Sequence, residues 1–276
     1  MTRFVDVGST PVVSALRRRA YARKIARLRD AWRHRGTAYA EAWPDSANHG
    51  AADGENPLRA FVAARTQGRG VWKWDHYFDA YHRHFARFRG TDVRILEIGI
   101  YSGGSLEMWH EYFGARCHVY GVDVEQACRE YEDERTTVFI GDQADREFWR
   151  RFRVAVPVLD IVVDDGGHQT EQQATSLEEL LPHLRFGGVY VVEDHHGTRN
   201  QFAAYMSGLV DALNAYSGIA DHANPERRKV SRARGFQAAI DSIHAYPYMT
   251  VIERRHDAVA EFIAPKRGTQ WEPFLS

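Results

Sequence analysis

The sequence predicts an α/β protein: a doubly wound, mostly parallel, seven-stranded sheet with an N-terminal helical extension. Short apolar runs recur from residue 93 onward, and such runs are typical of strands buried on both faces. Helical stretches at 105–113 and 170–184 lie between them and would form the crossovers of a right-handed doubly wound sheet. The chain of 276 residues is long enough for one large α/β domain and an appendage.

The N-terminal part, residues 1–70, is expected to form a unit distinct from the sheet domain at residues 71–276. Between Arg17 and Arg35 nine basic residues accompany the single acid Asp30. Apolar residues share one stripe at helical spacing, so the segment predicts a basic amphipathic helix. They are Leu16, Tyr21, Ile25, Leu28 and Trp32. Such a helix can bind a membrane surface, RNA or another subunit, and we favour docking on its own domain or on a neighbouring subunit.

The remaining elements follow in order along the chain. Residues 36–70 are rich in Ala, Gly, Asn and Asp and predict a loop or lid with one short helix near Leu58–Arg65. Residues 72–88 carry aromatic side chains that suit a helix packed on a core. The predicted strands are Val93–Ile98, His118–Val122, Thr137–Ile140, Leu159–Val163 and Val189–Glu193, followed by an antiparallel pair at Ala238–Ile243 and Met249–Arg254.

Composition narrows the class of protein. The formal net charge of −1 gives no general reason to expect nucleic acid as a partner. The two cysteines, Cys117 and Cys128, argue against a disulfide scaffold and for a reducing compartment. No apolar run approaches the ~20 residues of a membrane span, and the N-terminus lacks the core of a signal peptide. We therefore expect a cytoplasmic protein without a membrane span.

The glycine-rich turn after the first strand indicates the ligand. The segment reads Val93-Arg-Ile-Leu-Glu-Ile-Gly-Ile-Tyr-Ser-Gly-Gly-Ser105, in which glycines let backbone N–H groups approach a ligand closely. Tyr101 stands where the dinucleotide fingerprint requires its second glycine. Glu97, at the end of the strand, would repel a pyrophosphate but suits a ligand that carries an ammonium and a sulfonium. These features predict S-adenosylmethionine.

Acidic and amide residues also follow the second and third strands. Asp123 is placed to accept both ribose hydroxyls, and Asp142 or Gln143 to contact the adenine. A single aspartate in such a position can equally cap a helix, but three polar ends in this order favour the methyl donor. The residues expected to bind it are Glu97, Gly99, Tyr101, Ser102, Gly103, Ser105, Asp123, Asp142, Gln143 and Asp164.

A second cluster of acids and histidines follows the fourth and fifth strands. Asp165 belongs to the run Asp164-Asp-Gly-Gly-His168, and Glu193 and Asp194 precede two histidines. Carboxylates brought together in a partly desolvated site repel one another and need a cation, and oxygen ligands suit Mg²⁺. We expect Asp165, Glu193 and Asp194 to bind the metal, whereas for His195 and His196 we favour simple exposure.

Transfer of a methyl group to an alcohol requires a base, because a hydroxyl is a poor nucleophile at neutral pH. Bound Mg²⁺ can acidify a coordinated hydroxyl, and His168 can then take the proton. The acceptor oxygen, the methyl carbon and the sulfur would be held in line. Glu97 would hold the methyl donor indirectly, through its amino end or through backbone N–H groups.

Six motifs between Trp72 and Arg254 resemble the metal-dependent sugar O-methyltransferases of antibiotic biosynthesis, of the mycinamicin and macrocin type. The motifs are Trp72-Lys-Trp-Asp-His-Tyr77, Leu96-Glu-Ile-Gly99, Gly103-Gly-Ser-Leu-x-Met-Trp109, Gly141-Asp-Gln143, Val163-Asp-Asp-Gly-Gly-His168 and Gly187-Gly-Val-Tyr-Val-Val-Glu-Asp194. The resemblance implies a Rossmann-like class I methyltransferase fold, Mg²⁺ on Asp165, Glu193 and Asp194, and His168 as base. It further implies methylation of a secondary hydroxyl of a deoxysugar, on a glycoside or a nucleotide sugar, by a homo-oligomer.

The chain departs from that family at a few points. Gly167 stands where the family often has serine, and His195-His196-Gly197 follows the acid pair where other side chains are common. The first seventy residues do not match strongly. These differences bear on the acceptor pocket, the lid and the subunit contacts rather than on the methyl-donor site.

Three other interpretations remain open at the level of sequence. Asp165, His168 and the pair of histidines could form the facial triad of a non-haem Fe(II) oxygenase. The domain could instead be a degenerate cofactor-binding module without activity, or the acceptor of a methyltransferase could be a phenol or a lipid head group. Trp74, Tyr77, Tyr101 and Tyr205 could stack on a sugar, although aromatic residues at this spacing more often pack in a core.

Overall fold

The computed structural model describes residues 11–43, 56–196, 200–215, 228–265 and 267–268. The chain divides into two compact units, Met1–Gly54 and Glu55–Ser276. This division lies before the expected boundary at residue 70, because helix α2 (Pro57–Ala64) packs against α3 (Tyr77–Phe85) and α4 (Gly104–Phe113) of the larger unit. The larger unit therefore includes the segment that leads into the first strand.

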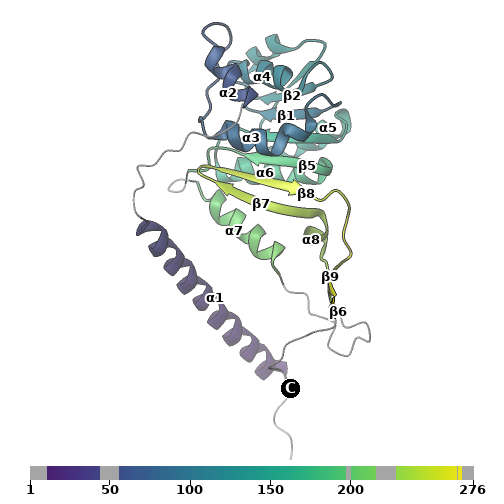
Figure 1. Ribbon diagram of the computed structural model, residues 1–276. Coiled ribbons are helices and arrows are strands. Elements are labelled where there is room, and N and C mark those ends of the chain that lie inside the picture. Colours follow the sequence, from purple (N-terminus) through teal and green to yellow (C-terminus); the bar gives the residue numbers. More distant parts are fainter. Residues whose placement is uncertain (1–10, 44–55, 197–199, 216–227, 266, 269–276) are drawn as a thin grey trace, which may run out of the picture. The chain divides into compact units, whose positions relative to one another are not determined.

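The larger unit is built on a seven-stranded sheet of order β3-β2-β1-β4-β5-β8-β7 (Figure 1). Strands β1 to β5 are parallel, and β8 and β7 complete the sheet in antiparallel orientation. This arrangement confirms the predicted doubly wound sheet and its closing antiparallel pair. The strands are β1 Arg94–Ile98, β2 His118–Asp123, β3 Thr136–Ile140, β4 Leu159–Asp164, β5 Leu184–Val192, β7 Ile240–Tyr246 and β8 Met249–Arg254.

Helices cover both faces of the sheet because residues along each central strand alternate between two cores. On β1, Ile95 belongs to the core under α2, α3 and α4, whereas Leu96 belongs to the core under the other helices. Those helices are α5 Arg146–Ala155, α6 Thr170–Leu180 and α7 Phe202–Leu213, and short helical turns complete the unit at α8 Gly235–Ala239, η1 Ala86–Phe88, η2 Gln126–Tyr131 and η3 Leu181–His183. The unit is thus a three-layer sandwich with polar strand ends at one edge.

Several element boundaries differ from the sequence prediction. The helix expected from residue 72 begins only at Tyr77, and Trp74 precedes it with 49% of its surface exposed rather than packed in the core. The expected helix 170–184 ends at Leu180, and β5 already begins at Leu184. Pro182 supplies the reason, because proline sits readily in the first turn of η3 but not inside a continuing helix. A small sheet of β6 Arg228–Arg232 and β9 Glu261–Pro265 was not predicted.

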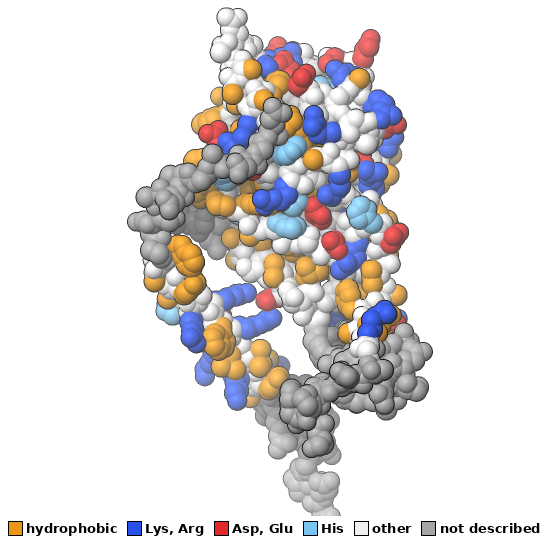
Figure 2. All heavy atoms as spheres, viewed as in Figure 1, with side chains coloured by type: hydrophobic (Ala, Val, Ile, Leu, Met, Phe, Trp, Pro, Cys, Tyr) orange, Lys and Arg blue, Asp and Glu red, His pale blue; other side chains and the backbone are white. Residues whose placement is uncertain are grey.

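Helix α1 spans Pro11–Glu41 in the smaller unit and so continues past the expected loop start at residue 36. Its side chains are described from Arg19 onward, and Figure 2 shows hydrophobic and basic groups interleaved along it. Tyr21 and Trp32 are both more than half exposed. The docking predicted for this helix remains a prediction. No helix in the described parts of the chain is long and apolar enough to cross a membrane.

Candidate active site

A cavity of about 1190 Å³ opens at the carboxyl ends of the parallel strands. Its walls come from the turn after β1, the ends of β2, β4 and β5, and the segment 70–77 that crosses in front of them. This is where ligands bind in open α/β sheets, because the strand ends diverge there. Among the residues expected to bind the methyl donor, those that line the cavity are Gly99, Tyr101, Ser102, Ser105, Asp123 and Gln143.

Two glycines of the turn allow close approach of other backbone segments. Gly99 has φ of +88°, and a Cβ atom there would lie 2.1 Å from the carbonyl oxygen of Asp165. At Gly104 a Cβ atom would lie 2.2 Å from the carbonyl oxygen of Gly70. The glycines therefore serve the packing of the turn against β4 and against segment 70–77, besides opening the backbone to a ligand.

Asp123 holds the turn from the neighbouring strand. Its Oδ2 accepts hydrogen bonds from the N–H groups of Ile100 at 2.8 Å and Tyr101 at 3.2 Å, and it lines the cavity as expected. Asp142 instead accepts a hydrogen bond from the N–H of Ala144 at 2.8 Å and lies outside the cavity lining. This hydrogen bond closes a short turn before α5, whose N-terminal cap is Asp145, so the ligand contact expected of Asp142 stays a prediction.

Three further predicted contacts also lie outside the lining. Asp164 is wholly buried and accepts hydrogen bonds from Gln143 Nε2 at 3.0 Å and from Ser176, and its burial raises its pKa to about 6. Alternation along β4 turns Asp164 toward α6 and Asp165 toward the cavity. Gly103 begins α4 against the ring of Tyr131.

Glu97 is the third of these residues and is fully buried beneath the turn. It accepts a hydrogen bond from Trp109 Nε1 at 3.1 Å and forms an ion pair with Lys73 at 3.2 Å. Burial, the largest influence, raises the pKa of Glu97 above its ordinary value. The structure therefore places Glu97 behind the cavity lining, and its indirect hold on the methyl donor stays a prediction.

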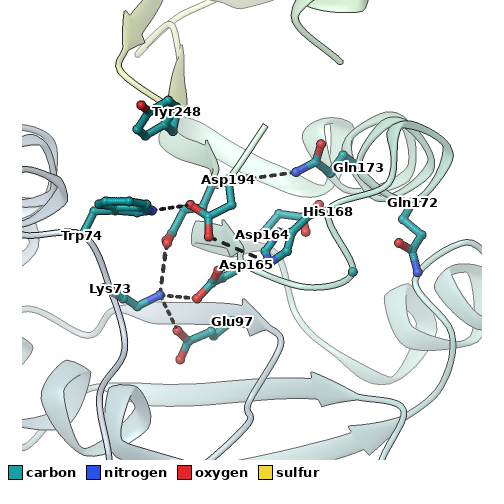
Figure 3. Close-up of polar contacts among 12 residues, drawn as sticks. Lys73, Trp74, Glu97, Asp164, Asp165, His168, Gln172, Gln173, Asp194 and Tyr248 are labelled. Atoms are coloured by element: carbon teal, nitrogen blue, oxygen red, sulfur yellow. Dashed lines mark hydrogen bonds and ion pairs between the residues drawn. The ribbon is translucent and has the colours of Figure 1, made fainter. Parts of the chain in front are cut away.

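Lys73 lies at the centre of the acidic cluster (Figure 3). Its Nζ is 2.8 Å from Asp165 Oδ2 and 3.3 Å from both carboxylate oxygens of Glu193. Burial of Lys73 opposes its charge, but Asp165 and Glu193 outweigh this effect and raise the pKa of the ammonium well above its ordinary value. The sequence reasoning gave no role to Lys73, although it lies in one of the recognised motifs.

Aromatic groups from the same segment hold the two acids that follow β5. Tyr77 Oη donates a hydrogen bond to Asp194 Oδ1 at 2.6 Å, and Trp74 Nε1 donates to the same oxygen at 3.1 Å. Tyr81 Oη donates to Glu193. Burial and then the charge of Asp165 raise the pKa of Glu193 well above its ordinary value. The sequence predicts that these aromatic residues pack in the core. Their hydroxyl and indole groups also orient the carboxylates of Glu193 and Asp194.

His168 faces this cluster from the loop after β4 (Figure 3). Its Nε2 lies 4.0 Å from both Asp165 Oδ1 and Asp194 Oδ2, and its Nδ1 is buried without a hydrogen-bond partner among the described residues. The backbone has φ of +53°, uncommon for a residue with a side chain, and Asn200 Nδ2 donates to its carbonyl oxygen at 2.7 Å. The loop is thus held in an unusual conformation that turns the imidazole toward the acids.

The donor atoms near the cavity fit a divalent cation. Asp165, His168 and Asp194 each offer one atom, and these atoms lie within 4.8 Å of one another. Glu193, the third ligand expected from the sequence, is nearly inaccessible, with 1% of its side chain exposed, and is engaged by Lys73 and Tyr81. Glu193 lines the cavity, but its carboxylate is not part of the group of potential ligand atoms formed by Asp165, His168 and Asp194.

The two histidines after Asp194 have different surroundings. His195 Nε2 forms a hydrogen bond with Thr250 Oγ1 at 3.0 Å, and burial lowers the pKa of its imidazole. His196 lines the cavity and packs on the ring of Tyr248 with centroids 5.0 Å apart. Neither joins Asp165 and His168 in the cluster of potential ligands found among the described residues. The facial triad considered from the sequence is therefore not assembled in this form.

No family model matches the chain. It is 34% identical over 225 residues to 8-demethyl-8-alpha-L-rhamnosyl tetracenomycin-C 2'-O-methyltransferase of Streptomyces olivaceus, covering 74% of this chain and 57% of the relative. It is 41% identical over 143 residues to mycinamicin VI 2''-O-methyltransferase of Micromonospora griseorubida, covering 49% and 34% of the two chains. The chain is homologous to sugar O-methyltransferases of antibiotic biosynthesis.

The solved structures agree with this assignment. MycE, a methyltransferase of the mycinamycin pathway determined with Mg and S-adenosylhomocysteine, is 27% identical, with a TM-score of 0.57. The match covers 72% of this chain and 54% of MycE. The larger unit thus has the class I methyltransferase fold, while the chain spans 57% or less of the length of the relatives named here.

Proposed function

We propose that the protein is an S-adenosylmethionine- and Mg²⁺-dependent O-methyltransferase that acts on a secondary hydroxyl of a deoxysugar. The acceptor would be a glycosylated natural product or a nucleotide sugar. One observation carries the proposal: a glycine turn and an Asp165–His168–Asp194 cluster line the same cavity. The relatives named above as rhamnosyl or mycinamicin O-methyltransferases agree with an acceptor of this class.

The methyl donor would lie along the turn after β1. Asp123 would accept hydrogen bonds from the ribose, and its hydrogen bonds to the N–H groups of Ile100 and Tyr101 fix the turn beforehand. Gln143, which lines the cavity and whose Oε1 accepts a hydrogen bond from Gly167 N–H at 2.7 Å, would contact the adenine. This preorganisation reduces the ordering that binding would otherwise require.

Asp165 and Asp194 would hold Mg²⁺, with Glu193 supporting them through Lys73. The ion, when bound, supplies positive charge that lowers the pKa of a coordinated hydroxyl. It would also offset repulsion among these acids, because Glu97, Asp165 and Glu193 share the ammonium of Lys73 and Asp194 is held by the neutral groups of Tyr77 and Trp74. Both the negative charge of these residues and their oxygen atoms are therefore suited to Mg²⁺.

His168 would act as the base. Its Nε2 takes the proton of the acceptor hydroxyl as the oxygen forms a bond to the methyl carbon and the carbon–sulfur bond breaks, leaving S-adenosylhomocysteine. The carboxylates of Asp165 and Asp194, each 4.0 Å from Nε2, stabilise the imidazolium that results. The remaining contribution of the chain is to align the three reacting atoms.

Exposed aromatic rings at the cavity favour a sugar. Trp72 and Tyr101 are 85% and 73% exposed, their ring centroids lie 6.3 Å apart, and both line the cavity. Trp74 lies 5.5 Å from the ring of Tyr248. Flat apolar rings beside polar groups suit the C–H face of a pyranose, whereas Tyr205, also considered for this role, packs on Phe202 instead. Phenols and lipid head groups are the competing acceptors.

Two further parts of the proposal concern the whole protein. The exposed tyrosine and tryptophan side chains of α1 support a homo-oligomer in which this helix contacts a neighbouring subunit. Cys117 and Cys128 are both free and buried, which supports a reducing, cytoplasmic location.

Calorimetric titration tests the proposal directly. S-adenosylhomocysteine should bind with and without Mg²⁺, whereas NAD should not bind. Radiolabelled methyl transfer to nucleotide sugars and rhamnosides should then require Mg²⁺ and be abolished in an Asp165→Asn variant. Absence of S-adenosylhomocysteine binding contradicts the proposal, as does turnover that depends on Fe(II) and a 2-oxoacid.

A further inference from the structure

A second group of potential metal ligands lies at the far end of α3 from the active site. His84 is in the last turn of α3, His244 is on the edge strand β7, and Glu253 is on β8. In the β7–β8 register Ser242 pairs with Glu253, and His244 with Val251. His244 and Glu253 are therefore diagonal neighbours on one face of the sheet, and α3 covers that face.

The side chains converge closely. His84 Nδ1 lies 2.6 Å from Glu253 Oε1, and the rings of His84 and His244 have centroids 4.6 Å apart. One ligand atom from each of the three residues lies within 4.8 Å of the other two. Only 4% of the His84 side chain and 19% of the Glu253 side chain are exposed, whereas His244 on the edge strand is partly buried.

One ring nitrogen of His84 is held by a hydrogen bond, as is usual for histidines that bind a metal through the other nitrogen. His84 Nε2 forms a hydrogen bond with the hydroxyl of Tyr246 at 2.9 Å. In the tautomer with its proton on Nε2, His84 would exchange the Nδ1 hydrogen bond to Glu253 for a bond from Nδ1 to a metal ion. A ligating histidine commonly donates its other N–H to an oxygen in this way, which fixes the ring and its tautomer.

We propose that His84, His244 and Glu253 form a binding site for Zn²⁺ or a closely similar transition metal ion, separate from the active site. Two imidazoles and one carboxylate are a donor set that proteins use for zinc, whereas Mg²⁺ prefers oxygen ligands alone. A tetrahedral ion would hold its ligand atoms about 3.3 Å apart, so His84 and Glu253 need to separate by less than an ångström. Water would complete the coordination.

The site would fasten α3 to the edge of the sheet. The same helix carries Tyr77 and Tyr81, whose hydroxyl groups hold Asp194 and Glu193 in the active site. Seven residues of helix separate Tyr77 from His84, or about 10 Å. An ion at this position would stabilise the helix that orients the acidic cluster without touching the reacting groups.

Arg87 opposes the ion and so offers a sharp test. Its Nη1 lies 3.2 Å from Glu253 Oε1, and its Nη2 donates to the carbonyl oxygen of Gly187 at 3.2 Å. A cation at Glu253 would compete with this guanidinium for the carboxylate. Removal of Arg87 is therefore expected to strengthen metal binding. A variant that merely damaged the fold would be expected to weaken it instead.

Zinc titration in an Asp165→Asn/Asp194→Asn background isolates the site from the active-site cluster. We expect one equivalent of Zn²⁺ to bind and to raise the melting temperature. Adding His244→Ala to this background should weaken zinc binding about a hundredfold. Loss of a hydrogen-bond partner of a ligand can already weaken metal binding that much, and loss of the ligand itself should cost at least as much. His118→Ala is the matched control, because His118 is also half-buried on a strand of the same sheet but lies near Thr137.

The outcome is decisive in either direction. Equal zinc affinity in the His244→Ala and His118→Ala variants overturns the proposal, as does absence of zinc binding in the background variant. Arg87→Ala guards against a folding artefact: it should bind zinc more tightly, about tenfold, because the competing cation is gone. An unchanged or weaker affinity in this variant also overturns the proposal.

Discussion

Lys73 Nζ lies 2.8 Å from Asp165 Oδ2, so one buried ammonium joins the segment before α3 to the end of β4. The same group reaches both carboxylate oxygens of Glu193 at 3.3 Å. The segment 70–77 is therefore held across the carboxyl ends of the strands by buried ion pairs, in addition to the packing of Val71 and Tyr77 in the core. This contact forms one wall of the cavity and sets the charge of its acidic side.

Replacement of Lys73 should destabilise the protein strongly. In Lys73→Met the buried carboxylates of Asp165 and Glu193 lose their counter-charge, and breaking a buried ion pair from one side costs about 3–5 kcal/mol. Urea unfolding measures the loss of unfolding free energy. The control Arg146→Met removes exposed ion pairs with Glu178 and Glu179 and should cost at most about 1 kcal/mol. Equal losses in the two variants would contradict the central role of Lys73.

Gly99 should tolerate no side chain. In Gly99→Ala the new Cβ meets the carbonyl oxygen of Asp165 at 2.1 Å, so β4 must move away from the turn. Gly90→Ala is the control, because Gly90 also has positive φ, +70°, but nothing within 4 Å of the added atom. Backbone strain alone costs about 1–2 kcal/mol in the control, whereas Gly99→Ala should cost more and weaken S-adenosylhomocysteine binding. Thermal unfolding and calorimetry would compare the two.

Asp123 and Asp142 should differ although both follow a strand. In Asp123→Asn an NH2 group replaces one of the two carboxylate oxygens, which together accept three backbone hydrogen bonds, so the turn loosens and any ribose contact weakens. We expect S-adenosylhomocysteine affinity to fall about tenfold to a hundredfold, the equivalent of one or two charged hydrogen bonds. Asp142→Asn retains the cap on Ala144 and should leave the affinity unchanged. Similar losses in both variants would show that Asp142 contacts the ligand after all.

His110 should make stability fall on mild acidification. Burial, followed by the nearby charge of Arg135, lowers the pKa of His110 to about 4 from an ordinary 6.5. Between these values the unfolded chain binds more protons, so stability is intact above pH about 6.5 and declines as the pH falls toward about 4. After allowance for the partial exposure of the ring, the effect is about 1 kcal/mol. In His110→Gln, urea unfolding at pH about 7.5 and 5 should show a smaller difference than in the parent; an identical difference refutes the assignment.

The central strands were predictable because their signal is local. An apolar run such as Leu159–Val163 is buried on both faces wherever the sheet places it, so its neighbours in sequence suffice to identify it. The ends of the elements were harder to predict. The helix before Pro182 ends earlier than expected, and β5 begins earlier than expected. The pair β6 and β9 lacked such a signal, because β9 is exposed along its length, β6 is rich in basic residues, and the two strands pair across a long separation in the chain.

The acidic cluster was also predictable in outline, since parallel strands deliver their carboxyl ends to one edge of the sheet. Which acid faces the cavity was not. Asp164 and Asp165 are adjacent in sequence, yet alternation turns one toward Ser176 and the other toward Lys73. Asp123 and Asp142 occupy similar places near their strand ends and each accepts a hydrogen bond from the N–H two residues on, yet only Asp123 also holds the turn after β1 and lines the cavity.

From its residues alone the chain determined the order of strands and helices, the glycine turn and the set of acids at the strand ends, because these depend on local periodicity and on topology. Tertiary packing decided the partners of those acids. The part of the chain before the sheet supplies Lys73, Tyr77 and Tyr81, which bind these acids. The same part supplies His84, which meets His244 and Glu253 from strands late in the sequence. Such contacts depend on side-chain direction across long separations in sequence, which no local pattern records.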